Sequence, residues 1–290
     1  MAIDSLAGLM QAGAERDLFD VILENDCRER GALREDSLAR MRMLYAAIRR
    51  AGRGYDPALR SGSGMVGGDG ARMRAHAASG KTICGEYIGS VIAQALEMGE
   101  SNACMKCIVA APTAGSCGVL PAVLLPYQQR EGLDDETMVR AMYVSGMIGQ
   151  IIARKASIAG ASGGCQAEIG SASAMAAAAL CYLAGGSAEA VCHAAAIAVK
   201  SLLGLVCDPI AGLVEVPCVK RNAAGAMIAM SSADMALAGI RSAVPPDEVI
   251  AAMREVGDKM DVSLKETGVG GVAGTPFGQS IAKKMSGKSE

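Results

Sequence analysis

Three cysteines beside glycine or proline are the residues of this sequence best suited to metal chemistry. Cys165 lies in Gly-Gly-Cys-Gln, Cys207 in Val-Cys-Asp-Pro and Cys218 in Val-Pro-Cys-Val, and each segment is typical of a loop. Closed zinc sites and most iron-sulfur clusters have four protein ligands. Three thiolates with no obvious fourth therefore indicate an open metal position. In a [4Fe-4S] cluster, that opening leaves one iron free to act as a Lewis acid on a substrate oxygen, which suits a hydro-lyase.

Four Gly-rich segments are a second kind of candidate site. They offer backbone N–H groups and small hydroxyls, which suit a carboxylate, particularly at a helix N-terminus. None has the sequence of a Walker A loop or the strand-turn-helix setting of a dinucleotide fingerprint. One such segment is equally well explained as a tight helix connection, but four in a helical chain favour a convergent anion site. The segments cover 60–70, 112–118, 160–165 and 268–274.

The remaining cysteines are not expected to bind metal. Cys104 and Cys107 form a C-x-x-C pair, but no second pair follows at zinc-finger spacing. Cys117 lies in the second Gly-rich segment and is expected near the substrate, as a loop residue rather than an iron ligand. The others lie in apolar helical patterns and are expected to pack in the core; they are Cys27, Cys84, Cys181 and Cys192.

Helices must position these residues, because strand signals are few. Apolar spacing and capping residues predict one mainly α domain over residues 1–290, with Gly-rich loops between its helices. Pro245 and the acidic residues that follow it are typical of a helix start. The other expected helices cover about 4–31, 34–51, 83–98, 134–155, 187–203 and 222–240.

The composition limits the class of protein. Hydrophobic residues make up 51% of the 290 residues and aromatics only 3%, so small and aliphatic side chains must form the core. The Ala-rich run 174–184 is too short to span a bilayer, and a net charge of -2 without a basic run disfavours nucleic acid. Asp4 stands where a secretory signal has basic residues, which favours a cytoplasmic protein. Because the cytoplasm is reducing, the ten cysteines are expected to be free thiols, metal ligands or redox groups rather than disulfides.

Several long motifs resemble the α chain of iron-sulfur-dependent L-serine dehydratases, also called L-serine ammonia-lyases. The resemblance is strongest over 61–277 and implies a mainly helical catalytic domain. It also implies a [4Fe-4S] cluster bound by Cys165, Cys207 and Cys218. An enzyme of this family uses the cluster, without pyridoxal phosphate, to eliminate water from L-serine and give pyruvate and ammonia. Such a reaction belongs to amino-acid catabolism and gluconeogenesis. The motifs are Ala111 to Gly118, Gly163 to Glu168, Cys207 to Pro209, Val216 to Asn222, and Glu266 to Gly268.

Within this resemblance, two Gly-rich segments are expected to bind the carboxylate of L-serine. Asp69 and Asn102 are expected to orient water or the substrate amino group. The carboxylate would meet the backbone N–H groups and hydroxyls of Ser61, Gly62, Ser63, Thr113, Ala114, Gly115 and Ser116.

The general base is not visible in this chain. His76 and His193 have settings typical of structural residues, and Lys155 is a weaker candidate. Lys220 and Arg221 either offset cluster charge or form a solvated pair at a helix start. The resemblance implies that a separate β chain, which carries the family's second domain and its Ser-Ser-His-Thr motif, supplies the acid-base histidines.

The end of the sequence departs from some single-chain members of that family. Those chains finish with a cysteine that reaches back to the cluster, whereas this sequence finishes Lys-Met-Ser-Gly-Lys-Ser-Glu. Water or another small ligand is therefore expected on the fourth iron. Three other functions stay open: elimination of sulfide from cysteine at the same cluster, an electron-transfer module with a fourth ligand, and a metal-free interaction scaffold.

Overall fold

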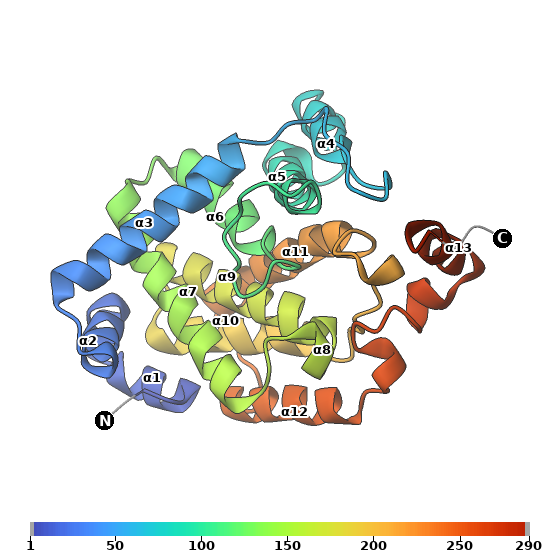
Figure 1. Cartoon of the computed structure of the whole chain (residues 1–290). Coiled ribbons are helices and arrows are strands. Elements are labelled where there is room, and N and C mark those ends of the chain that lie inside the picture. The colour runs from blue at the N-terminus through green and yellow to red at the C-terminus, as the bar shows by residue number, and fades with distance from the viewer. Residues whose placement is uncertain (1–2, 288–290) are drawn as a thin grey trace.

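The computed structural model describes residues 3–287, and every regular element in that range is a helix (Figure 1). The mainly α, single-domain expectation is therefore confirmed. One isolated parallel bridge, between Cys207 and Lys265, is the strand-like pairing found in the described range. Residues 288–290, part of the tail expected to carry no ligand, lie outside it.

The helices follow one another through short connections. In chain order they are α1 (Leu6–Ala12), α2 (Leu18–Arg30), α3 (Arg34–Arg53), α4 (Asp69–Ala78), α5 (Gly85–Ala103), α6 (Val119–Glu131), α7 (Asp135–Lys155), α8 (Gly160–Gly163), the π-helical η1 (Gln166–Gly170), α9 (Ser171–Leu183), α10 (Ala188–Ser201), η2 (Ile210–Gly212), α11 (Cys218–Leu237), α12 (Pro246–Lys259), η3 (Val262–Leu264), η4 (Gly271–Gly274) and α13 (Pro276–Met285).

Helix α9 forms the centre of the bundle, with α7, α10 and α11 packed around it (Figure 1). Every residue from Ser171 to Cys181 is buried, and six of these are alanines. Side chains this small allow helix axes to approach closely. The low aromatic content is thus compatible with a continuous core, as the composition predicted.

Capping residues set several helix boundaries as expected. The Asp134 side chain accepts a hydrogen bond from the Thr137 backbone N–H (2.8 Å) at the start of α7, and Ser187 accepts one from Ala190 (3.2 Å) at the start of α10. The continuous helix expected over 4–31 is wrong. It ends near Gly13, and Asp17 caps a new helix by accepting from the Phe19 N–H at 2.8 Å.

Two features of the helical pattern were not predicted correctly. Helix α11 begins at Cys218, four positions before the expected start at Asn222. Helices α4, α6, α9 and α13 were not among the expected helices. The first correction matters for chemistry, because it places Cys218 in a helical first turn rather than in a loop.

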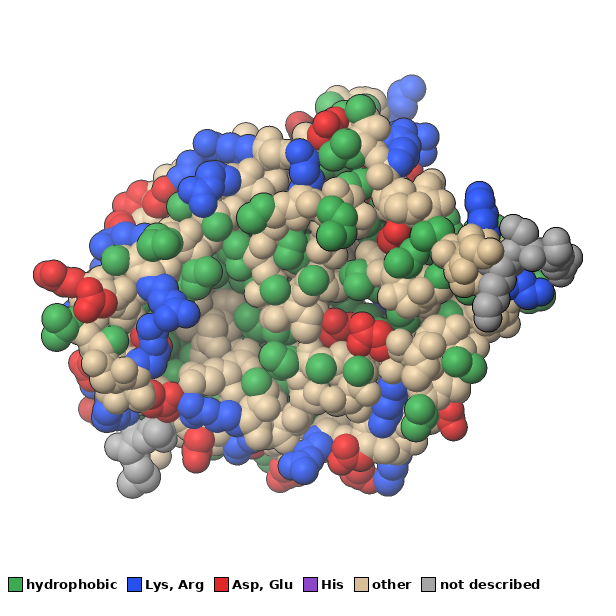
Figure 2. Space-filling view, viewed as in Figure 1, with side chains coloured by type: hydrophobic (Ala, Val, Ile, Leu, Met, Phe, Trp, Pro, Cys, Tyr) green, Lys and Arg blue, Asp and Glu red, His purple; other side chains and the backbone are tan. Residues whose placement is uncertain are grey.

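The described helices include none that is long and apolar enough to cross a membrane. On the face shown in Figure 2, acidic and basic side chains alternate and do not form a broad patch of one sign.

The two histidines lie in different settings. His76 is exposed on α4, whereas His193 is buried on α10 and its Nδ1 accepts a hydrogen bond from the Ser242 backbone N–H at 3.2 Å. Burial lowers the pKa of His193; Glu189 opposes this change, and Arg241 and Lys200 reinforce it. Neutral imidazole is therefore the form that the fold accommodates.

This burial predicts an acid sensitivity of folding. Below the ordinary histidine pKa of about 6.5, the unfolded chain binds a proton at His193 more readily than the folded chain, so stability falls as pH falls through the folded pKa. We expect the urea midpoint to decline less between pH 7.5 and 5.5 in His193→Gln than in the wild type. The exposed-site variant His76→Gln should behave as the wild type, and equal declines in all three proteins would contradict the prediction.

Candidate functional site

Cys165, Cys207 and Cys218 lie in different segments but gather at one location. All three are buried, with relative exposures of 3%, 2% and 6%. Cys165 directly precedes η1, Cys207 lies between α10 and η2, and Cys218 is the first residue of α11. The Cys207 thiol interacts electrostatically with the other two, and Cys218 interacts with Cys165. Three widely spaced thiols are thus brought together by the fold.

Backbone hydrogen bonds anchor these segments to one another. The Cys207 N–H donates to the Leu264 carbonyl at 2.8 Å, and the Cys207 carbonyl accepts from the Glu266 N–H at 2.6 Å. The Gln166 N–H donates to the Leu205 carbonyl at 2.9 Å, while its side-chain oxygen accepts from the Gly204 N–H at 2.9 Å. Cys165 and Cys207 are therefore held by the same local network.

Glu168 connects the thiols to the Thr113–Ser116 loop. Its Oε1 accepts a hydrogen bond from Thr113 Oγ1 at 2.6 Å, and its Oε2 lies 3.7 Å from Cys207 Sγ. Ser116 Oγ accepts from the Thr113 N–H at 3.3 Å. The N–H groups of Ala114, Gly115 and Ser116 have no acceptor among the residues described. The loop therefore presents unpaired donors beside the thiols.

Asn222 fixes that loop to helix α11. Its Oδ1 accepts from the Gly118 N–H at 2.8 Å, and its Nδ2 donates to the carbonyls of Gly115 and Cys218, each at 2.9 Å. Asn222 is 1% exposed, so these bonds are shielded from water. The loop and Cys218 consequently share one rigid support.

Burial dominates the electrostatics of the thiols. It raises the pKa of Cys165 to about 11 and that of Cys218 to about 12, and it raises the pKa of Cys207, where Glu168 adds to the effect. Burial and Glu266 also raise the pKa of Glu168. Because metal ligation requires thiolates, a cationic centre must offset this cost if the thiols are ligands.

Arg221 contributes one positive charge near these groups. Burial raises the pKa of Cys165, and the Arg221 guanidinium partly offsets this rise; Arg221 also forms an ion pair with the buried Asp208 at 2.8 Å. Lys220 is 79% exposed and its Nζ lies 3.7 Å from an Asp69 carboxylate oxygen. Of the two cations considered from the sequence, Arg221 therefore lies at the thiols and Lys220 lies in solvent.

Three cysteine thiols are a donor set of the kind that an iron-sulfur cluster takes. No three His, Cys, Asp or Glu side chains in residues 3–287 are arranged to hold one metal ion. An iron-sulfur cluster takes its cysteines on different irons, so its ligands need not meet at one point. A Cβ at Gly160 would lie 2.8 Å from Cys207 Sγ and 2.7 Å from Glu168 Oε2. Glycine therefore preserves space beside the thiols.

The Ser61–Ser63 segment is engaged with a protein carboxylate. The hydroxyls of Ser61 and Ser63 both donate to Glu215 Oε2, the former at 2.6 Å. Glu215 is 5% exposed, and its carbonyl accepts from the Val219 N–H at 3.0 Å, next to Cys218. Gly62 has no heavy atom within 4 Å of an added Cβ. Carboxylate binding by these hydroxyls is thus present, but the carboxylate is the chain's own.

Two predicted substrate residues have other contacts or positions. Asp69 begins α4, where its N–H donates to Glu100 Oε1 (2.8 Å) and its side chain pairs with Arg72 (2.8 Å). Asn102 lies in the last turn of α5, where its carbonyl accepts from the Met105 N–H at 3.0 Å. Contact with the thiol group is described for neither residue, and their roles toward substrate stay predictions.

The other candidates have partners outside the group of three thiols. Burial raises the pKa of Cys117 to about 12, and its Sγ lies 3.8 Å from the Met98 carbonyl. Cys84 is exposed just before α5, so the prediction that it packs in the core is wrong, because the helix begins after it. Lys155 pairs with Asp247 at 3.1 Å.

The sequence analysis assigned no role to most of the polar residues that hold the segments of the site together. Asn222 follows Cys218 by one helical turn, so an earlier helix start would have placed both on one face. Glu168 and Asp208 stand close to the cysteines in sequence, which was a usable signal. Glu215 and Glu266 act through contacts with segments distant in sequence, which no local pattern reveals.

The fold and site together define a mainly helical, single-domain protein built around a group of buried thiols. A model of the family described as serine dehydratase alpha chain matches residues 14–273. The chain therefore belongs to the serine dehydratase alpha chain family.

Individual relatives agree with this assignment. The chain is 46% identical over 274 residues to the probable L-serine dehydratase alpha chain of Bacillus subtilis, covering 93% of this chain and 90% of that protein. It is 51% identical over 219 residues to the L-serine dehydratase alpha chain of Peptoniphilus asaccharolyticus, covering 76% and 75%. It is 45% identical over 181 residues to the L-serine dehydratase of Streptomyces coelicolor, covering 62% of this chain and 40% of that longer protein.

Proposed function

We propose that this chain is the α subunit of an L-serine dehydratase, which converts L-serine to pyruvate and ammonia in the cytoplasm. In this proposal Cys165, Cys207 and Cys218 hold a [4Fe-4S] cluster, and no pyridoxal phosphate takes part. The observation that carries it is the convergence of three buried thiols with a loop that has unpaired N–H donors. The names of the relatives support the same substrate.

The reaction has to remove a weakly acidic Cα proton and expel hydroxide. When bound, the cluster would supply a Lewis acid for the β-hydroxyl. The N–H groups of Ala114, Gly115 and Ser116 are suited to bind the substrate carboxylate, because they have no acceptor among the described residues. Asn222 holds the loop in place through Gly115 and Gly118, so these donors are preorganised.

The chain's own histidines are poorly placed for acid-base catalysis. His193 accepts a backbone N–H with one nitrogen, and His76 is exposed on α4. We therefore propose that a separate β chain supplies the base, consistent with the alpha-chain names of two relatives and the greater length of a third.

The proposal is tested on protein purified without oxygen. We expect iron and acid-labile sulfide in about four copies each, as a [4Fe-4S] cluster requires, and a visible absorption band. With the β chain present, L-serine should yield equimolar pyruvate and ammonia, and added pyridoxal phosphate should not restore activity to iron-free protein. Full activity in protein without iron would refute the cluster. Pyruvate formed faster from L-cysteine than from L-serine would refute the substrate.

Separation of the subunits is expected to abolish turnover. The pure α chain should carry iron but form no pyruvate, because its two histidines lie outside the thiol site. Adding the β chain should restore activity, measured as pyruvate formation. If the α chain alone is fully active, the base lies within this chain.

A further inference from the structure

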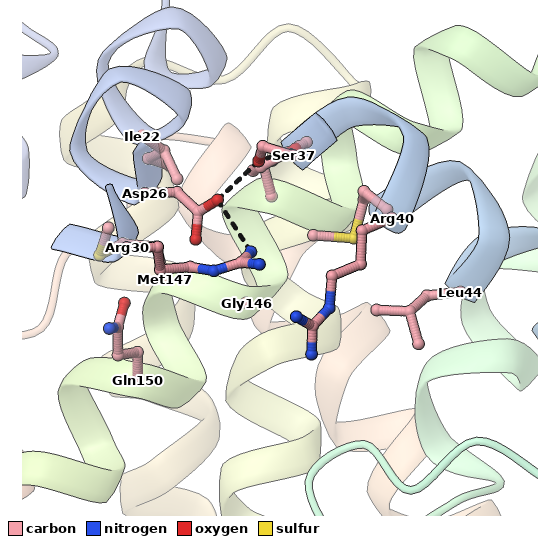
Figure 3. A pocket seen from close by; sticks show the side chains of 11 residues that line it. Ile22, Asp26, Arg30, Ser37, Arg40, Leu44, Gly146, Met147 and Gln150 are labelled. Atoms are coloured by element: carbon pink, nitrogen blue, oxygen red, sulfur yellow. Dashed lines mark hydrogen bonds and ion pairs between the residues drawn. The ribbon is translucent and has the colours of Figure 1, made fainter. Parts of the chain in front are cut away.

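A pocket of about 210 Å³ lies between helices α2, α3 and α7, and none of the three site thiols lines it (Figure 3). Ligand sites for drug-sized molecules usually measure about 300–1,000 Å³, so this volume suits a smaller metabolite. Its lining combines charged, hydroxyl and aliphatic side chains: Ile22, Asp26, Arg30, Ser37, Arg40, Met41, Leu44, Tyr143, Gly146, Met147 and Gln150.

One wall of the pocket is a fixed polar network. Ser37 is 2% exposed; its Oγ donates to Asp26 Oδ2 at 2.6 Å and lies 2.6 Å from the Tyr143 hydroxyl. Arg30 pairs with the same Asp26 oxygen at 3.3 Å. These bonds hold Asp26 and one face of the Arg30 guanidinium in place before anything binds, which lowers the entropic cost of binding.

Arg40 is a cation without a partner in this pocket. In Figure 3 the Arg40 side chain extends from α3 and the Arg30 side chain extends from α2, and both lie near Gly146 of α7. Arg40 forms no hydrogen bond or ion pair with any residue described between 3 and 287, whereas Asp26 already neutralises Arg30. The pocket therefore has a net positive charge, and its planar donors are directed at a cavity.

Gly146 lines the pocket without contributing a side chain. It lies inside α7, where glycine costs about 1 kcal/mol relative to alanine, yet an added Cβ would meet no heavy atom within 4 Å. Gly149 on the same helix is different, because a Cβ there would lie 2.8 Å from Met175 Sδ. Internal packing thus explains Gly149, whereas at Gly146 the pocket has room for a further side chain.

We propose that this pocket binds a small organic carboxylate with a short aliphatic part. Arg40 and the free donors of Arg30 would bind the carboxylate, because guanidinium groups match its two oxygens. The aliphatic part would lie against Ile22, Leu44 and Met147. The inference concerns a second site and does not depend on the chemistry at the cysteines.

Isovalerate is a suitable probe, and calorimetric titration of the full chain measures its binding. We expect binding to the wild type with a Kd below about 10 mM, and at least tenfold weaker binding to Arg40→Gln, because a charge-assisted hydrogen bond is lost. Gly146→Leu should fill the cavity and abolish binding, whereas Gly146→Ala should bind as the wild type does. The alcohol 3-methylbutanol has the same carbon skeleton without the carboxylate and should not bind.

The variants also separate this proposal from simple loss of folding. Circular dichroism should show native helix content in Arg40→Gln, whose substitution is exposed. If Gly146→Leu fails to fold, Arg40→Gln alone decides the result. Wild-type protein that does not bind isovalerate, or unchanged binding in Arg40→Gln, would overturn the proposal. Equal binding of sulfate at the same ionic strength would overturn the claim that the pocket recognises an aliphatic group.

Discussion

Replacement of Cys207 by alanine is expected to leave the chain without bound iron and to reduce pyruvate formation by at least about a thousandfold. Lewis-acid catalysis by a metal contributes several kcal/mol to transition-state stabilisation, and each 1.36 kcal/mol changes a rate tenfold. Cys207 interacts with both other thiols and its Sγ lies 3.7 Å from Glu168 Oε2, so it belongs to the group of three thiols. Cys165→Ala and Cys218→Ala are expected to have the same effect. Iron content and pyruvate formation are measured on protein prepared without oxygen, in the presence of the β chain.

A matched substitution controls for the general loss of a thiol. Cys84 is exposed before α5 and makes no contribution to the thiol group, so Cys84→Ala should retain iron and activity. Thermal unfolding of the iron-free variants should remain cooperative, because a buried cysteine contributes mainly as a small apolar side chain. Full iron content in all three site variants would remove the proposed ligand set.

Local sequence determined much of the helical pattern. Asp134 and Ser187 cap their helices because their side chains accept the first free N–H groups, and this requirement is visible within three or four residues. The composition likewise predicted closely approaching helices, although the helix α9 itself was not among those expected. Prediction failed where a short break, such as Gly13 to Asp17, interrupts two apolar segments with compatible spacing.

The hydrogen bonds that join the segments of the site are tertiary contacts. The bonds that join Cys207 to Leu264 and Glu266 connect segments more than fifty residues apart, and no local periodicity encodes them. The sequence indicated correctly that Ser61 and Ser63 suit a carboxylate, but Glu215 occupies their hydroxyls. Residue type therefore predicted the chemistry of this contact, whereas only the fold identified its partner.

Loss of the Asn222 side chain is expected to be the most damaging single change to the support of the site. Asn222→Ala removes two buried hydrogen bonds and one partly buried one, and it leaves the Gly118 N–H without its acceptor. A buried donor left unsatisfied costs about 1–3 kcal/mol, so we expect the free energy of unfolding to fall by about 2–4 kcal/mol. Urea denaturation of the iron-free protein measures this change without reference to catalysis.

Asn222→Asp and Lys220→Ala complete this experiment. Aspartate retains an acceptor for the Gly118 N–H but loses the donor to Gly115 and Cys218, so its loss of stability should be intermediate. Lys220 lies on the same helix with 79% exposure, and its removal should change stability by no more than about 0.5 kcal/mol. If Asn222→Ala unfolds at the same urea concentration as Lys220→Ala, Asn222 does not support the loop.

Because the same three bonds hold the unpaired N–H groups of Ala114, Gly115 and Ser116 beside the thiols, the active αβ enzyme carrying Asn222→Asp should show a raised KM for L-serine.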